Sequence, residues 1–208
     1  MKDRDIITKN NRNFNDDFKI YVFKSGARYN FLNIFILVLQ YYYLMKNQVL
    51  DHKKIIRICN RLAYQIIENS ENKKSIILVG IKEKGYEVSK LIMQELNKIC
   101  SNKIILRYIE IDKTSPKNSL KCNLESTFKS SEKVFLIDDV LNTGKTLMYS
   151  VNKLLDYDFN SIKTVVLIDR NHKKFPVKVD FKGISLSTNY DDTVKLNFKK
   201  NNLEAIIT

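Results

Sequence analysis

The sequence is poor in the residues that bend chains or cross-link them. Its 208 residues include five glycines, two prolines and three cysteines. With 44% hydrophobic and 28% charged residues, this composition excludes a collagen-like or disordered chain. Cys59, Cys100 and Cys122 are too few and too widely spaced for a disulfide framework or a zinc site, and the two histidines add no ligand cluster. We therefore expect a reduced, cytoplasmic protein of one ordinary domain, with or without an extension.

Positive charge, in contrast, is abundant. Lys and Arg number 36 against 23 Asp and Glu, which gives a net charge of +13. An RNA-binding surface or a phosphate-rich substrate would explain this surplus. Drift of the gene toward A+T-rich codons would explain it equally, because lysines outnumber arginines 29 to 7 and Lys, Asn and Ile supply 76 residues. The charge alone does not select a function.

Residues 1–47 differ in character from the remainder and are expected to form an N-terminal extension to a domain over 48–208. The apolar run at 31–45 is shorter than the roughly 20 residues of a membrane-spanning helix. No small-residue cleavage site of a signal peptide follows it. Three interpretations remain open: a mis-assigned start upstream of a working initiator at Met45, an added helix that packs on the domain, or a weak membrane anchor.

Apolar residues recur with regular periods from residue 48 onward. Ile55, Cys59, Leu62 and Ile66 share one helical face, and Asp51 is the expected N-cap. Further helices are expected at 86–99 and 146–155, buried strands at 75–81, 103–111, 133–137 and 164–168, and edge strands at 184–188 and 193–198. The alternation predicts an α/β fold: a doubly wound, mostly parallel sheet with helices on both faces and a small hood or edge-strand region.

Two other features complete the outline of the domain. Polar residues 112–132 predict a long loop or flap, in which Cys122 is expected to be an exposed thiol. Four of the five glycines, Gly80, Gly85, Gly144 and Gly183, are expected at strand ends or turns where the backbone bends or approaches a ligand.

The stretch from Val134 to Thr146 joins an apolar strand, two acids and a Thr-Gly-Lys-Thr turn that opens a helix. Amides at that helix start, with the Thr143 and Thr146 hydroxyls, suit a phosphate monoester. The carboxylates of Asp138 and Asp139 can accept paired hydrogen bonds from vicinal sugar hydroxyls. The combination predicts a ribose 5-phosphate site. A Walker A loop is excluded because it needs glycine at position 139, and the remaining alternative is an ordinary helix N-cap beside two solvated acids.

At these residues the sequence resembles the type I phosphoribosyltransferases, whose donor is 5-phosphoribosyl pyrophosphate (PRPP). Their signature is an apolar run, two acids, three residues and Thr/Ser-Gly-x-Thr. The resemblance extends over about 49–198 and favours the bifunctional pyrimidine-operon attenuator and uracil phosphoribosyltransferase group. Supporting stretches are 78–85, similar to the pyrophosphate turn, 166–172, similar to a Val-Asp-Arg-x-His region, and 175–183, similar to the segment that frames the nucleobase.

The resemblance implies the type I phosphoribosyltransferase fold and a role for each matching residue. Catalytic Asp138 and Asp139 would hold the ribose hydroxyls; Asn142, Thr143, Gly144, Lys145 and Thr146 would bind the 5-phosphate; Lys82, Glu83, Lys84 and Gly85 would flank the pyrophosphate and its Mg²⁺; and Arg170, Lys178 and Asp180 would lie near the base. The cofactor Mg²⁺ is expected to be carried by PRPP, without a direct protein cluster.

The implied reaction is the displacement of pyrophosphate from the anomeric carbon by a ring nitrogen of a nucleobase, through an oxocarbenium-like transition state. Uracil is the expected base. A 6-oxopurine is the alternative, because Lys178 replaces an Arg of many attenuator-type members and similar Lys-x-Asp-Phe/Tyr segments occur in 6-oxopurine enzymes. The flap sequence from Glu110 to Thr114 departs from the Arg-Asp-Asp cluster of similar proteins.

Other partners and functions also follow from the resemblance. The group suggests a homodimer or higher homo-oligomer and, as a second function, an RNA-binding regulator of pyrimidine genes with weak activity. A protein of the same fold that has lost its activity is the third hypothesis. His172 is expected either to orient a loop or to contact a ligand.

Overall fold

The computed structural model describes residues 35–36, 38–39, 47–70, 75–111, 121–124, 132–199 and 202–208. The chain divides into two compact units, Met1–Met45 and Lys46–Thr208. Most of the predicted N-terminal extension lies outside the described residues; those described in the first unit, which include Phe35 and Leu39, are helical and exposed. Within the described ranges, no helix has the length and apolar character needed to cross a membrane.

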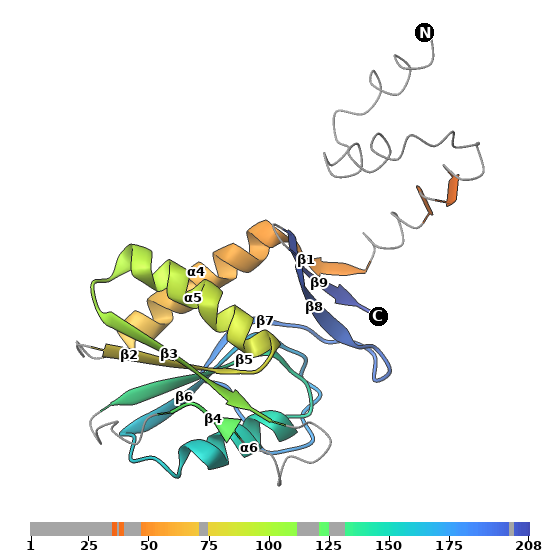
Figure 1. The fold of residues 1–208 in the computed structure, drawn as a ribbon. Coiled ribbons are helices and arrows are strands. Elements are labelled where there is room, and N and C mark those ends of the chain that lie inside the picture. Colours follow the sequence, from red (N-terminus) through yellow and green to blue (C-terminus); the bar gives the residue numbers. More distant parts are fainter. Residues whose placement is uncertain are drawn as a thin grey trace. The chain divides into compact units, whose positions relative to one another are not determined.

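The second unit is built on a sheet with the strand order β4-β3-β2-β5-β6-β7 (Figure 1). The strands are β2 (Ser75–Ile81), β3 (Lys103–Glu110), β4 (Lys121–Cys122), β5 (Lys133–Leu141), β6 (Ser161–Asp169) and β7 (Phe181–Ser185). All neighbouring pairs are parallel except β3 with β4. The predicted mostly parallel sheet is therefore confirmed.

Helices cover both faces of this sheet, as predicted. The helices α4 (His52–Glu68) and α5 (Lys84–Ile99) lie on one face and α6 (Lys145–Leu154) on the other (Figure 1). Successive strand residues point to opposite faces, so that Leu78 packs in the cluster with α4 and α5 while Ile77 and Val79 pack in the cluster with α6. Two cores, one on each side, hold the sheet in place.

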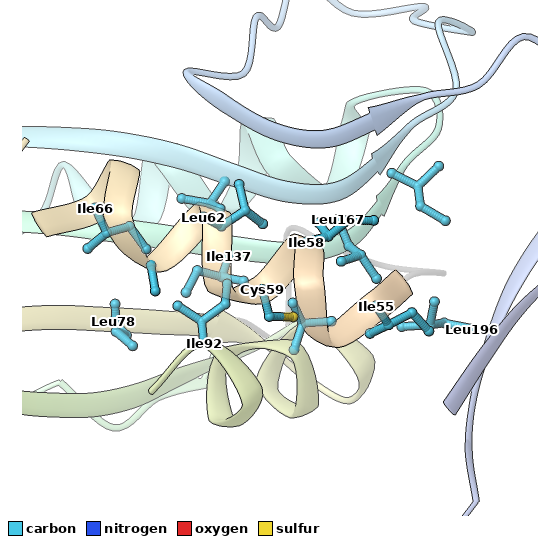
Figure 2. Packing of buried hydrophobic residues seen from close by; sticks show 14 of the residues in the cluster. Ile55, Ile58, Cys59, Leu62, Ile66, Leu78, Ile92, Ile137, Leu167 and Leu196 are labelled. Carbon is cyan, nitrogen blue, oxygen red and sulfur yellow. The ribbon is translucent and has the colours of Figure 1, made fainter. Parts of the chain in front are cut away.

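The predicted apolar face of α4 is buried in the first of these cores. Ile55, Cys59, Leu62 and Ile66 are each 0% exposed, and in Figure 2 Ile55 lies next to Leu196. The helix begins as expected, because the Asp51 carboxylate accepts a hydrogen bond from the Lys54 amide at 2.7 Å. Burial, with the nearby charge of Glu95, raises the pKa of Cys59 to about 12. This thiol is therefore a neutral core residue.

A separate three-stranded antiparallel sheet is formed by β1 (Gln48–Leu50), β8 (Val194–Lys199) and β9 (Asn202–Ile207), in the order β1-β9-β8. The predicted edge strand at 193–198 is β8, whereas the one predicted at 184–188 begins earlier, as β7, and joins the main sheet in parallel. The sequence did not predict β1 or β9. Three residues are too few to show an alternating pattern, and β9 is recognisable only through its pairing with β8.

The structure also moves some predicted boundaries. β5 continues through the two acids to Leu141, because its ladder with β6 extends to the pair Leu141 and Asp169. α5 begins at Lys84 instead of after Gly85. Within the predicted flap, most of which lies outside the described residues, β4 pairs with β3.

Cys122, in β4, is half-buried and not the exposed thiol that we expected. Its sulfur lies 3.1 Å from the Tyr157 hydroxyl. This hydrogen bond, together with burial, raises the pKa of Tyr157 to about 12.

Gly183 differs from its expected role at a strand end or turn, because it lies inside β7. A Cβ atom added there would collide with the Leu167 carbonyl oxygen and would come within 2.5 Å of Ile58 Cγ2. Glycine is needed at this position because β6 and α4 pack directly against the backbone of β7.

Candidate functional site

The carboxyl edge of the main sheet contains a point where the strand order reverses. The chain leaves β2 toward β3 and leaves β5 toward β6, although β2 and β5 are neighbours. In open α/β sheets, loops that diverge from such a point leave a crevice in which ligands bind. The turn after β2 and the loop after β5 both belong to this edge, and both carry sequence-predicted site residues.

The two acids of β5 have different surroundings. Asp138 is 9% exposed, and its Oδ1 accepts a hydrogen bond from the Asp139 amide at 3.0 Å. Asp139 is half-buried, and its carboxylate has no hydrogen-bond or ion-pair partner among the described residues. The carboxylate of Asp139 thus has acceptor oxygens available to a ligand.

The loop after β5 turns into α6 at Gly144, whose φ of 86° is in the left-handed region that favours glycine. The Lys145 amide donates to the Thr143 hydroxyl at 3.3 Å. The Thr143 carbonyl accepts from the amides of Lys174 and Phe175 at 2.9 and 3.1 Å. The first amides of a helix lack partners within it, so that the predicted anion-binding residues lie at a helix start fixed to the loop after β6.

The turn after β2 packs directly on the acid pair. A Cβ atom on Gly85 would lie 2.7 Å from the Ile137 carbonyl oxygen and 3.0 Å from Asp138 Cα. The absence of a side chain therefore lets the start of α5 contact β5 where the acids begin. The Lys82–Glu83 peptide bond in this turn is cis. The structure thus brings together the turn at 82–85 and the acid pair, which are separated in the sequence.

A cavity of about 180 Å³ lies beside the loop after β5. It is lined by Asn142, Thr143, Arg170, His172, Lys174, Tyr190, Asp191, Asp192 and Thr193. Tyr190 is 71% exposed, and the Lys174 ammonium lies 2.6 Å from its hydroxyl and 5.1 Å from its ring centre. His172 Nε2 is 2.9 Å from the Thr188 carbonyl oxygen, which holds the imidazole in the cavity wall. Tyr190 could not be identified from the sequence, because no motif or period distinguishes it.

The protein-family model described as the phosphoribosyl transferase domain matches residues 45–197 of the sequence. The chain belongs to the phosphoribosyltransferase family. The match includes the turn at 82–85, the acid pair and the Thr-Gly-Lys-Thr loop, and the resemblance drawn from those motifs is confirmed. The protein is accordingly an enzyme of the phosphoribosyltransferase class.

Two curated relatives are both named bifunctional protein PyrR. The one from Clostridium botulinum (strain Eklund 17B / Type B) is 31% identical over 163 residues, which cover 73% of this enzyme and 89% of the relative. The one from Leuconostoc mesenteroides is 33% identical over 156 residues, which cover 72% and 89%. The enzyme is therefore similar to PyrR proteins over nearly their whole length.

Solved structures show the same fold at lower identity. A hypoxanthine-guanine phosphoribosyltransferase from Bacillus anthracis matches with a TM-score of 0.64 at 14% identity, covering 78% of this enzyme and 98% of that chain. A hypoxanthine phosphoribosyltransferase from Trypanosoma cruzi matches with a TM-score of 0.61 at 14% identity, covering 77% and 95%. These matches establish the type I phosphoribosyltransferase fold that was predicted.

Arg170 of the enzyme lies in the cavity wall, where protein atoms surround its guanidinium. The residue is 3% exposed. It donates to Asn142 Oδ1 at 3.1 Å, to the Thr188 hydroxyl at 2.8 Å and to the Asp192 carbonyl oxygen at 2.5 Å. The guanidinium thereby ties the loop after β5 to the segment at 188–192.

The other two residues expected near the base, Lys178 and Asp180, do not line this cavity. The Asp180 carboxylate accepts from the Thr164 amide at 2.9 Å and from Lys163 at 3.1 Å, in the first half of β6. Burial by itself would raise the pKa of Asp180, but the hydrogen bonds from Thr164 and Lys163 lower it overall. Lys178 is exposed, and its carbonyl oxygen accepts from the Thr164 hydroxyl at 3.4 Å.

Asp169, at the end of β6, holds the loop that follows. Its carboxylate is 1% exposed and lies 3.0 Å from the Lys173 ammonium and 3.6 Å from that of Lys182. Burial would raise the pKa of Asp169, but the hydrogen bonds from Lys173 and the Asn171 amide, with the two ammonium charges, lower it overall. The sequence motif pointed to this loop without showing that its acid is satisfied by the protein itself.

Proposed function

We propose that the enzyme transfers the 5-phosphoribosyl group from PRPP to uracil and releases pyrophosphate. Membership of the family supports phosphoribosyl transfer as the reaction, and the similarity to PyrR proteins supports uracil as the base. The observation that carries the site is the close packing of Gly85 on Asp138. The turn proposed for pyrophosphate thus lies next to the acids proposed for ribose. In PRPP, these two groups are bonded directly to each other.

In this proposal the ribose and its 5-phosphate occupy the loop after β5. The Asp139 carboxylate accepts hydrogen bonds from the ribose hydroxyls, while Asp138 fixes the strand end through its bond to the Asp139 amide. The 5-phosphate binds at the start of α6, where Gly144 allows the turn and the first amides donate. Catalysis then rests on orientation of the ring and on stabilisation of the developing charge.

The nucleobase binds in the 180 Å³ cavity, next to the ring of Tyr190. Arg170 shapes this cavity by fixing Asn142 on one side and the segment at 188–192 on the other. An aromatic side chain at the rim offers a stacking surface for a planar base. The proposal thus adds Tyr190 to the base subsite and gives Arg170 a supporting role.

Mg²⁺ fits this site as an ion bound mainly by the substrate. Within the described ranges, no three His, Cys, Asp or Glu side chains form a metal site. Mg²⁺ prefers oxygen ligands and commonly binds through substrate phosphates with one or two carboxylates. The carboxylates of Asp139 and Glu83 are the oxygen donors proposed to face it. The ion would supply positive charge that neutralises the departing pyrophosphate.

A base panel tests the proposal. The full chain is assayed with PRPP and Mg²⁺ against uracil, orotate, hypoxanthine, guanine and adenine, and pyrophosphate release is measured. Uracil is expected to give the highest kcat/KM. A preference for hypoxanthine or guanine would replace uracil by a 6-oxopurine, and an absence of release with every base would contradict the proposed reaction.

A second candidate function, regulation through RNA, is favoured by the outer face of α4. Lys53, Lys54, Arg57 and Arg61 are exposed on this helix, whose single acidic residue is Glu68. Arg61 donates to carbonyl oxygens of β7, which anchors its guanidinium at the end of this row. Such a row suits a phosphate backbone.

Salt dependence tests this second function. Binding to a pyrimidine-operon leader RNA is expected to weaken steeply between about 50 and 200 mM salt, and Lys53→Ala and Arg57→Ala together should reduce the slope. Lys195→Ala, on β8, is the matched control. Binding that is insensitive to salt, or unchanged in the double variant, would contradict a role of this face.

A further inference from the structure

A lysine of the proposed pyrophosphate turn rests on an aromatic ring from the neighbouring strand. The Lys82 ammonium lies 4.4 Å from the centre of the Tyr108 ring and 3.3 Å from Glu110 Oε2. Tyr108 and Glu110 are alternate residues near the end of β3, which places both side chains on the same side of the strand. The Lys82 amide donates to the Ile109 carbonyl at 2.8 Å between them. Both the backbone and the ammonium of Lys82 are therefore held by β3.

The ring of Tyr108 has contacts that do not depend on Lys82. It packs edge-to-face on Tyr86, with 5.8 Å between the ring centres, and Tyr86 directly follows Gly85 at the start of α5. The Tyr108 amide donates to Asn123 Oδ1 at 2.7 Å, and its carbonyl accepts from the Asn123 amide at 3.3 Å. The contact with Tyr86 holds the ring, and the two bonds to Asn123 hold the Tyr108 main chain, so that Tyr108 is a fixed support for the long side chain of Lys82.

We propose that Tyr108 is a positioning residue for PRPP binding: its ring holds the Lys82 ammonium at the pyrophosphate turn before the substrate arrives. The inference rests on the proposed function of that turn. A lysine loses side-chain freedom when it binds an anion, and a lysine that is already ordered loses less. The contact with the ring consumes none of the three N–H donors of the ammonium. The diphosphate of PRPP can therefore take the place of Glu110 while the ring contact persists.

Two substitutions of Tyr108 distinguish the effect of its ring from the effect of its hydroxyl. Tyr108→Leu removes the aromatic face and Tyr108→Phe retains it. Because a partly exposed cation–π contact stabilises modestly, the KM for PRPP is expected to rise roughly two- to fivefold in Tyr108→Leu. The KM for uracil should stay unchanged, and Tyr108→Phe should behave as the unmodified enzyme. Equal effects of Leu and Phe, or an equal rise in both KM values, would overturn the positioning role.

A double-mutant cycle excludes a merely structural explanation. In a Lys82→Ala background, Tyr108→Leu is expected to cause no further loss of PRPP affinity, because the supported ammonium is already absent. A loss of the same size in both backgrounds would overturn the proposal. Tyr108→Met is the second ring-free variant should Tyr108→Leu not fold, and Tyr64→Leu, at an exposed position of α4, is the matched control.

Direct binding separates this inference from the proposed function. PRPP affinity is measured by calorimetry on the full chain, independently of turnover. An unmodified enzyme that binds no PRPP would refute both the site and the positioning role. An unmodified enzyme that binds PRPP, with Tyr108→Leu binding equally well, would refute the positioning role alone.

Discussion

The loops after β5 and β6 start at paired strand residues, Leu141 and Asp169, but their polar side chains are used differently. After β6, the Asp169 carboxylate and the Arg170 guanidinium are both buried and bonded to several protein partners. On β5, the Asp139 carboxylate has no such partner within the described ranges. An acid or a base at a strand end therefore does not identify a ligand site. A side chain whose hydrogen bonds are already made within the protein acts as a structural residue. A side chain whose hydrogen-bonding groups are still available is a candidate for ligand binding.

The largest expected effect is on the free energy of unfolding, after substitution of Arg170. Arg170→Met should lower the free energy of unfolding by about 3 kcal/mol, because the buried acceptors of Asn142, Thr188 and Asp192 lose their donor. Urea denaturation measures this change. Arg57→Met, at an exposed site on α4, is the control and should change it by less than about 0.5 kcal/mol. A loss below about 1 kcal/mol for Arg170→Met would remove the distinction between the loops.

For Asp139 we expect the reverse, a loss of turnover without a loss of stability. Asp139→Asn should lower kcat at least tenfold, which corresponds to about 1.4 kcal/mol, because a carboxylate that accepts two ribose hydroxyls is lost. Thermal stability should remain unchanged, since this carboxylate forms no hydrogen bond or ion pair with a described residue. Asp158→Asn, in the exposed turn before β6, is the matched control. Unchanged turnover in Asp139→Asn would argue against the site.

Asp169 predicts a pH dependence of stability. Its pKa is lowered in the folded protein, so its ion pairs stabilise above the ordinary pKa of 3.8 and are lost as pH falls through the lowered value. Asp169→Asn should cost about 1–2 kcal/mol at pH 7. The difference from the unmodified protein should vanish in strong acid. Unfolding curves recorded across this pH range provide the measurement, and a difference independent of pH would show that Asp169 acts through packing instead of charge.

The smallest effect concerns the backbone of the loop after β5. Gly144→Ala should destabilise the protein by about 1 kcal/mol, because an alanine at φ 86° is strained. Space is not limiting, since the added Cβ would lie 3.5 Å from Val177 Cβ. Differential scanning calorimetry measures the shift in Tm. A neutral or stabilising result would mean that the turn adapts without strain.

The parts of the site that lie close together in the sequence could be predicted from it. The strand, acids, glycine turn and helix of 134–146 follow one another directly, so that local patterns sufficed to predict the strand, the turn and the helix that the structure shows. The ribose 5-phosphate site that they indicate stays a prediction. Helix α4 could also be predicted from the sequence, because its buried face follows from the spacing of its own apolar residues. In both cases the physical cause, backbone geometry or amphipathicity, acts within a few residues.

Features created by distant contacts could not be predicted. The partners of Arg170 come from 142 and 188–192, and the cavity that contains Tyr190 exists only when these segments meet. β4 has two residues and is defined by its pairing with β3. The resemblance placed Arg170 near the base, but only the hydrogen-bond partners show that its charge is used by the protein.

The contact between Gly85 and Asp138 has a consequence for how the surface of this enzyme can change. Main-chain atoms meet there without an intervening side chain, so the spacing between two parts of the site is set by the backbone alone. Substitution of surface arginines by lysines, or enrichment in asparagine, leaves such a spacing untouched. An enzyme with only five glycines can thus accumulate a strongly biased composition while the geometry that its chemistry requires is inherited intact.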